Sequence, residues 1–142
     1  VFNYAVADVD KDAVEFNVVT LRQNWTASFS AIELSDEYQK IFGPISEKAI
    51  SKIRVPQKTL NTVIREEIPG LERIDIMSLD IEGGEYNCLR GLDLQKYKPR
   101  VMVIENADAS NKTIQNYLES FGYKLDKQIS YNEYYIADDF AR

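Results

Sequence analysis

Two apolar runs dominate the hydrophobic pattern of this 142-residue chain. Residues 74–79 are nearly all apolar and lead into Asp80, and residues 101–104 are wholly apolar and lead into Glu105. Such runs are typical of parallel strands covered on both faces, and the Gly-punctuated helical sequence between them fits a crossover connection. The pattern therefore predicts a strand, a helix and a second, parallel strand as the core of the fold.

The segments around this unit switch between strand and helix periodicity. Alternating apolar positions predict strands, and apolar positions that recur every three or four residues predict helices. The expected strands are 1–6, 14–18, 50–55, 123–129 and 133–137, and the expected helices are 30–42, 60–68 and 114–121. The strand at 14–18 is expected near a sheet edge, and the last two strands are expected to form a hairpin. Together they predict one α/β domain over residues 1–142, with a mostly parallel sheet and a C-terminal antiparallel hairpin.

Charge and hydropathy narrow the classes of partner. The chain has 17 basic and 23 acidic residues, a net charge of −6, so no nucleic-acid partner is expected. No stretch approaches the roughly 20 apolar residues that a membrane helix needs, so no membrane partner is expected. Without a leader-like segment, a cytoplasmic location is expected. The chain begins at Val1 inside an apolar segment, so further sequence is expected upstream.

The absence of His and the presence of a single Cys exclude several kinds of chemistry. Ser-His-Asp and Cys-His nucleophiles and the usual zinc ligand sets all need these residues. A general base must therefore come from a carboxylate, Lys or Tyr. Cys88 has no intrachain partner, which favours a reducing compartment, and on a predicted helix it is expected to be a small buried hydrophobe.

Acidic residues follow both apolar runs. Asp80, Glu82 and Glu85 surround Gly83 after the first run, and Glu105 ends the second. Because ligands of open parallel sheets bind outside the carboxyl ends of the strands, these acids are expected to converge on one site. The alternative is that they cap or flank the following helix, with Glu85 complementing the helix dipole.

Several motifs resemble the downstream half of the FkbM-type methyltransferases. They are Thr59-Leu60, residues 74–85 with the Asp80-Ile81-Glu82-Gly83-Gly84-Glu85 segment, Leu89-Arg90-Gly91, Pro99 and Val103-Ile104-Glu105. In that family a Thr-Leu-Asp precedes a helix, a strand runs into Asp-x-Glu-Gly-x-Glu, a Leu-x-Gly follows and a later strand ends in Glu. Residues 3–8 are similar to the family's third strand. The resemblance covers nearly all of the chain, and Asn61 stands where the family usually has Asp.

The resemblance implies the C-terminal portion of a methyltransferase domain with a truncated Rossmann-like fold. It implies that S-adenosylmethionine is bound and that its methyl group passes to a hydroxyl of a small-molecule acceptor, a sugar or a natural product. Asp80, Glu82 or Glu105 is the expected base, because an alcohol must lose its proton. The expected cofactor contacts are Ala5, Asp8, Asp80 and Gly83. A divalent metal is left open, because hard cations also take oxygen ligands.

Two parts that hold the cofactor in the family are not found in this chain. They are a glycine-rich loop between a strand and a helix and an acidic residue after a second strand, and both are expected upstream of Val1. In the family's sheet these two strands lie between the third and fourth strands, so a gap is expected there. An exposed strand edge favours pairing with another chain, so a homo-oligomer is expected.

Two other function classes remain open on the sequence. One is a non-catalytic α/β module that acts in assembly or protein binding. The other is a receiver-like doubly wound protein, whose acids also cluster at strand ends but which fits the crossover and terminal hairpin less well. Trp25 and Phe29 are expected to line an acceptor pocket, whereas Tyr131, Tyr134 and Tyr135 are expected to pack rather than to stack on a substrate.

Overall fold

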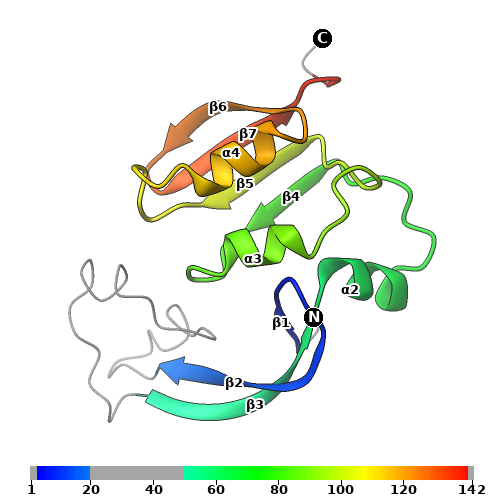
Figure 1. The fold of residues 1–142 in the computed structure, drawn as a ribbon, viewed down its shortest axis with the longest axis vertical. Helices are drawn as coiled ribbons and strands as arrows, with labels where there is room; N and C mark the ends of the chain where they lie inside the picture. The colour runs from blue at the N-terminus through cyan, green and yellow to red at the C-terminus, as the bar shows by residue number, and fades with distance from the viewer. Residues whose placement is uncertain (1–2, 20–49, 141–142) are drawn as a thin grey trace.

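The computed structural model describes residues 3–19 and 50–140, which form two β-sheets with helices packed beside them (Figure 1). The strands are β1 (Ala5–Val6), β2 (Lys11–Val19), β3 (Ile50–Lys58), β4 (Ile76–Leu79), β5 (Val101–Glu105), β6 (Tyr123–Ile129) and β7 (Asn132–Ala137). The helices are α2 (Leu60–Glu67), α3 (Glu85–Arg90) and α4 (Thr113–Glu119). The predicted helix at 30–42, Trp25 and Phe29 lie outside the described residues.

The larger sheet has the strand order β4-β5-β7-β6. β4 and β5 pair in parallel, which confirms the predicted central unit, and β6 and β7 form the predicted antiparallel hairpin. The expectation of a mostly parallel sheet is corrected to a mixed one. The reason is that the returning strand β7 inserts between β5 and β6 and runs against β5.

One face of this sheet carries the core. α3 and α4 lie on the same face, and Figure 1 shows α4 in front of β5 and β7. The side chains buried there are Leu79, Cys88, Leu89, Met102, Ile104, Ile114, Leu118, Tyr123 and Tyr135. On the opposite face of β4, Ile76 is 71% exposed, so the expectation that both apolar strands are covered on both faces is wrong for β4. β4 is an edge strand of this sheet, and the helices that follow β4 and β5 leave its other face open.

The smaller sheet has the order β1-β3-β2, with β1 parallel and β2 antiparallel to β3. β2 is at the edge, as its alternating pattern predicts. β3 continues past the predicted end at Val55 to Lys58. It can run through Pro56 because the register with β2 shifts there, and an irregularity in the ladder accommodates a residue that has no N–H to donate.

α2 begins with its own cap and contacts the segment after α3. The Thr59 hydroxyl accepts a hydrogen bond from the Thr62 N–H at 3.1 Å. The Asn61 N–H donates to the Gly91 carbonyl at 3.0 Å, and Asn61 Oδ1 accepts from the Asp93 N–H at 2.9 Å. An Asp at position 61 offers the same acceptor oxygen, which explains why this departure from the family motif preserves the contact.

Cys88 lies on α3 and is fully buried, which confirms its prediction as a small core residue. Burial, and then the nearby Glu85 carboxylate, raise the pKa of the thiol to about 12, so it stays protonated. Among the helices of the described part of the chain, none is long and apolar enough to cross a membrane.

Candidate active site

The carboxyl ends of β4 and β5 form the edge at which the acidic residues were expected. Leu79 pairs in register with Ile104, and Asp80 and Glu105 each come one residue later. They therefore occupy matching positions on adjacent parallel strands, which lie about 4.8 Å apart. Asp80 is exposed and Glu105 is half-buried. The structure thus brings together at one rim two carboxylates that are 25 positions apart in the chain.

The turn that links β4 to α3 adopts an unusual backbone conformation. Glu82 and Gly83 have φ values of 61° and 96°, in the left-handed region. That region suits Gly83, whereas for an L-residue such as Glu82 it costs about 1 kcal/mol or more. Something in the surroundings must therefore hold the turn in place.

Glu85 provides that support. Its Oε1 accepts hydrogen bonds from the Ile81 N–H at 2.9 Å and from the Gly83 N–H at 3.2 Å. The side chain is only 4% exposed and stands in the first turn of α3, where a negative charge complements the helix dipole. These contacts favour the alternative interpretation of Glu85, in which it has a structural role beside the helix.

The other two predicted cofactor contacts lie elsewhere. Ala5 is the first residue of β1 and is buried against β3. The Asp8 carboxylate pairs with Arg90 at 3.3 Å, at the end of α3 opposite to the 80–84 turn. The structure therefore does not bring Asp8 next to Asp80.

The described carboxylates do not form a tight cluster. Within residues 3–19 and 50–140, no three His, Cys, Asp or Glu side chains lie close enough together to hold a metal ion. An open pocket of about 480 Å³ lies between α2 and residues 93–97, and its lining mixes Arg65 and Lys96 with Glu72 and Asp93. None of the predicted site residues lines this pocket, so it is separate from the rim of β4 and β5.

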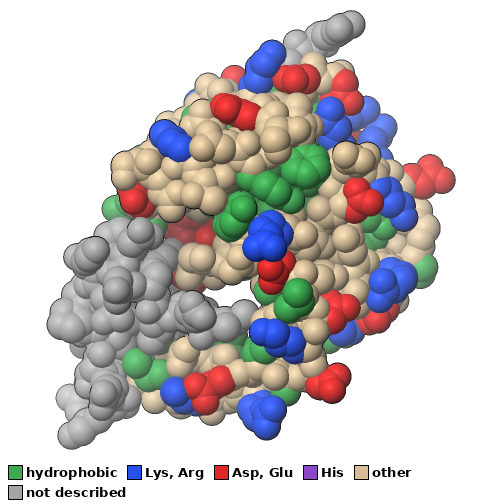
Figure 2. All heavy atoms as spheres, in the orientation of Figure 1, with side chains coloured by type: hydrophobic (Ala, Val, Ile, Leu, Met, Phe, Trp, Pro, Cys, Tyr) green, Lys and Arg blue, Asp and Glu red, His purple; other side chains and the backbone are tan. Residues whose placement is uncertain are grey.

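Side chains of both signs are interspersed over the visible face of the molecule. In Figure 2, Lys and Arg side chains alternate with Asp and Glu, and no continuous basic surface covers this face. Hydrophobic side chains gather over α3 and α4. The ring of Tyr117 on α4 lies 5.5 Å from that of Tyr86 on α3 and 5.0 Å from that of Phe121, measured between ring centroids.

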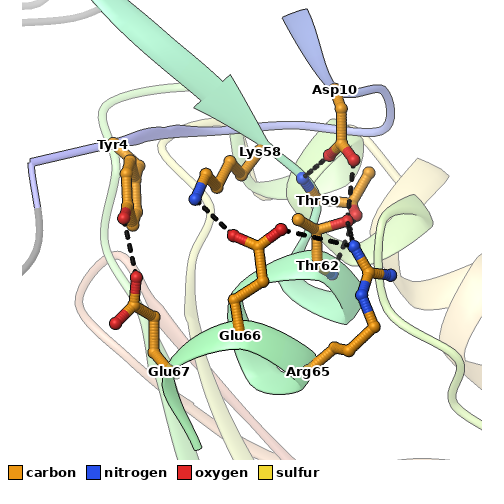
Figure 3. Close-up of polar contacts among 8 residues, drawn as sticks. All are labelled: Tyr4, Asp10, Lys58, Thr59, Thr62, Arg65, Glu66 and Glu67. Atoms are coloured by element: carbon orange, nitrogen blue, oxygen red, sulfur yellow. Dashed lines mark hydrogen bonds and ion pairs between the residues drawn. The ribbon is translucent and has the colours of Figure 1, made fainter.

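Asp10 is a residue that the sequence did not single out beyond its turn chemistry. It lies between β1 and β2 and points to the start of α2 (Figure 3). Its carboxylate accepts from the Thr59 N–H at 2.6 Å and from the Thr62 hydroxyl at 2.7 Å. No sequence signal could have found this contact, because the partners are 49 and 52 positions away.

The same close-up shows two further ties to α2. Lys58, the last residue of β3, contacts Glu66 at 2.5 Å, and the Tyr4 hydroxyl donates to Glu67 Oε1 at 2.7 Å. The Lys58 ammonium also lies 4.0 Å from the centre of the Tyr4 ring. These contacts fasten the smaller sheet to α2, which in turn contacts Gly91.

The Asp10 contact predicts a pH dependence of stability. The hydrogen bonds, the one from the Thr59 N–H first, lower the pKa of Asp10 in the folded state. A lowered carboxyl pKa contributes stability above the unfolded value of about 4, and this contribution is lost as the pH falls through the folded value. We expect Asp10→Asn to lower the urea midpoint at neutral pH and to converge with the parent as the pH falls from about 5 through the lowered pKa of Asp10.

Urea midpoints at each pH check this expectation. Asp12→Asn, in the exposed first part of β2, is the matched control and should leave the midpoint unchanged. A difference between parent and Asp10→Asn that is equally large at neutral and acidic pH would contradict the assignment.

The comparisons with known proteins identify the family of this chain. The family model of the methyltransferase FkbM domain matches residues 1–125. Among curated proteins, the methyltransferase sdnD of Sordaria araneosa is 35% identical over 83 residues, which cover 52% of this chain and 32% of that protein. The chain thus spans about a third of the length of the curated relative it matches. No solved structure matches it. Since the family match covers most of the chain, including β1 to α4 and the acidic rim, the chain belongs to the FkbM methyltransferase family.

Proposed function

We propose that this chain is part of an S-adenosylmethionine-dependent O-methyltransferase that acts on a hydroxyl of a sugar or natural product. The observation that carries the proposal is the parallel pairing of β4 and β5, with Asp80 and Glu105 in matching positions at its carboxyl end. Family membership and the similarity to a named methyltransferase support methyl transfer.

The resemblance also supports a Rossmann-like arrangement. In the family, two strands separate the third strand from the fourth. The counterpart of the third strand is β1, and it belongs to a different sheet from β4. An arrangement in which further strands lie between β1 and β4 is compatible with this separation.

The chemistry of the rim fits a cationic cofactor. Bound S-adenosylmethionine would supply an electrophilic methyl group on a positively charged sulfur, and carboxylates complement that charge. Asp80 and Gly83 would hold it, because Gly83 leaves the backbone of the turn without a side chain where a ligand approaches. Ala5 and Asp8 are assigned to the cofactor by the resemblance alone.

The acids of this chain supply the proton acceptor for the reaction. A hydroxyl oxygen that gains a methyl group must lose its proton, and a carboxylate positioned beside it takes that proton. Asp80, Glu82 and Glu105 are the candidates on the rim and its turn. Holding the acceptor hydroxyl in line with the transferred methyl group is the second task of the site.

Calorimetric titration tests the proposal. S-adenosylmethionine is titrated into the protein that contains this chain together with any sequence that precedes it, and labelled-methyl transfer is measured to a panel of sugars, polyols and phenols. We expect binding and transfer to at least one hydroxyl compound. Absence of binding would refute the enzyme assignment and favour a module for assembly or protein binding.

Three conservative variants then assign the roles on the rim. Among Asp80→Asn, Glu82→Gln and Glu105→Gln, we expect one to lower the turnover of methyl transfer about 100-fold, because it removes the base. Glu82→Gln and Glu105→Gln should leave cofactor affinity unchanged, whereas Asp80→Asn should also weaken cofactor binding. Asp126→Asn, at an exposed position of β6, is the control and should leave both quantities unchanged. If all three variants keep the parent turnover, the base lies outside this rim.

A further inference from the structure

A carboxylate is buried directly beneath the rim. Glu133 of β7 is 0% exposed and pairs in register with Ile104 of β5. Its Oε1 accepts from the Asn106 amide Nδ2 at 3.0 Å, and its Oε2 accepts from the Tyr135 hydroxyl at 2.5 Å. Burial, and then the hydrogen bond to Glu133, raise the pKa of Tyr135 above its ordinary value, so the phenol keeps the proton that it donates.

Asn106 connects this carboxylate to the rim. It follows Glu105 directly, and its backbone N–H donates to the Tyr131 carbonyl at 2.7 Å. Its side-chain amide donates one hydrogen bond to Glu133 and the other to the Asn111 carbonyl, at an Nδ2–O distance of 3.2 Å. Asn106 therefore ties the end of β5 to the hairpin and to the loop that leads into α4.

The backbone around Glu105 is held by contacts at Glu105 itself and at the residue that follows it. Its own backbone pairs with Asn132 in the ladder between β5 and β7, and the next residue is held by the bonds just described. A shift of Asn106 would move the backbone from which the Glu105 side chain projects. The geometry of the rim therefore depends on a polar group that does not itself reach the surface.

Stability does not explain why a carboxylate occupies this position. The ion pairs of the described part of the chain all lie elsewhere, so Glu133 has hydrogen-bond donors but no cation beside it. Burying a charge is costly, and a well-packed apolar side chain in its place is often as stable or more stable. Buried polar groups of this kind are most useful where they hold a functional group in one orientation.

We propose that Glu133 is a positioning residue for Glu105, acting through Asn106 to fix the carboxyl end of β5. The assignment rests on the proposed function, because Glu105 is one of the acids offered there as the base. It extends that function to a residue outside the family match, which ends at residue 125.

The experiment compares a disruptive and a conservative change. Glu133→Leu combined with Tyr135→Phe replaces the carboxylate and the hydroxyl by apolar groups, so no buried hydroxyl is left without a partner. Glu133→Gln keeps an acceptor for Asn106, and its amide can donate to the Tyr135 oxygen. Tyr123→Phe is the matched control, because the Tyr123 hydroxyl is equally buried but bonds the Pro99 carbonyl, before the start of β5.

Amide hydrogen exchange, thermal unfolding and methyl-transfer kinetics are measured on each variant. For the double variant we expect exchange over residues 105–111 to be about tenfold faster and kcat to be about 10- to 100-fold lower, with KM for S-adenosylmethionine within about threefold. Glu133→Gln should restore both quantities to near the parent values. Tyr123→Phe should lower the unfolding temperature without changing kcat measured well below it.

Two results would overturn the assignment. One is a double variant whose exchange and kcat match those of the parent, and the other is a Glu133→Gln protein that loses as much as the double variant. If the parent transfers no methyl group, the proposed function has failed, and hydrogen exchange over 105–111 alone decides whether Glu133 positions the rim.

Discussion

Glu85→Ala is expected to destabilise the protein by about 3 kcal/mol, because it removes the acceptor of two backbone N–H groups from a buried site. Those donors belong to Ile81 and Gly83, on the turn that carries Asp80 and Glu82. The strained Glu82 conformation would lose its support at the same time. We therefore also expect weaker binding of S-adenosylmethionine by the variant. Urea unfolding measures the first effect and calorimetry the second.

Glu85→Gln distinguishes the contribution of the hydrogen-bond acceptor from that of the negative charge, because it keeps the first and removes the second. The Gln carbonyl oxygen can accept both hydrogen bonds that Glu85 Oε1 accepts, so its cost should be about 1 kcal/mol. Equal losses for the Ala and Gln variants would show that the negative charge at the start of α3 matters more than the two bonds. An Ala variant as stable as the parent would contradict the structural role of Glu85 altogether.

Gly91→Ala is expected to cost about 3 kcal/mol or more, because the new methyl group collides with the backbone. A Cβ at this position would lie 2.3 Å from the Ala7 carbonyl oxygen. The Gly91 φ of −82° suits any residue, so the loss comes from the collision alone. Ala7 cannot easily move away, since its N–H donates to the Lys58 carbonyl and continues the pairing of β1 with β3.

Thermal unfolding and the yield of folded protein measure this effect. A loss of about 3 kcal/mol corresponds to a fall of about 10 °C in the unfolding temperature of a domain of this size. Gly70→Ala is the matched control: its φ is +90° but nothing lies within 4 Å of the added Cβ, so only conformational strain of about 1 kcal/mol is expected. If both variants lose the same amount, the close approach of Ala7 to Gly91 is not what makes glycine necessary.

Local periodicity was sufficient to predict most of the strands and helices that the structure describes. The apolar runs before Asp80 and Glu105 predicted β4, β5 and their parallel pairing, since a run of that kind followed by a helix returns in the same direction. The helical stripes predicted α2 and α4, and alternation predicted the final hairpin. These predictions succeeded because each depends on residues within a few positions of one another.

The buried polar residues were harder to predict. Glu133 has the same strand parity as Tyr135 and Ala137, which is the one signal in the sequence that it faces the core. Nothing in the sequence indicated that its partner is Asn106, 27 positions away. Nor did the sequence indicate that Asp10 accepts hydrogen bonds from Thr59 and Thr62 at the start of α2.

Sequence patterns were enough to predict most strands and helices of residues 3–19 and 50–140, and to predict that two acids follow neighbouring parallel strands. Tertiary structure alone decided that β4 has one open face, that Asp8 pairs with Arg90 at the far end of α3, and that Glu85 supports the turn. A periodic pattern depends on residues only a few positions apart, so it can be read from the sequence. Burial and hydrogen-bond partners depend on which distant segments the fold brings into contact, so they cannot.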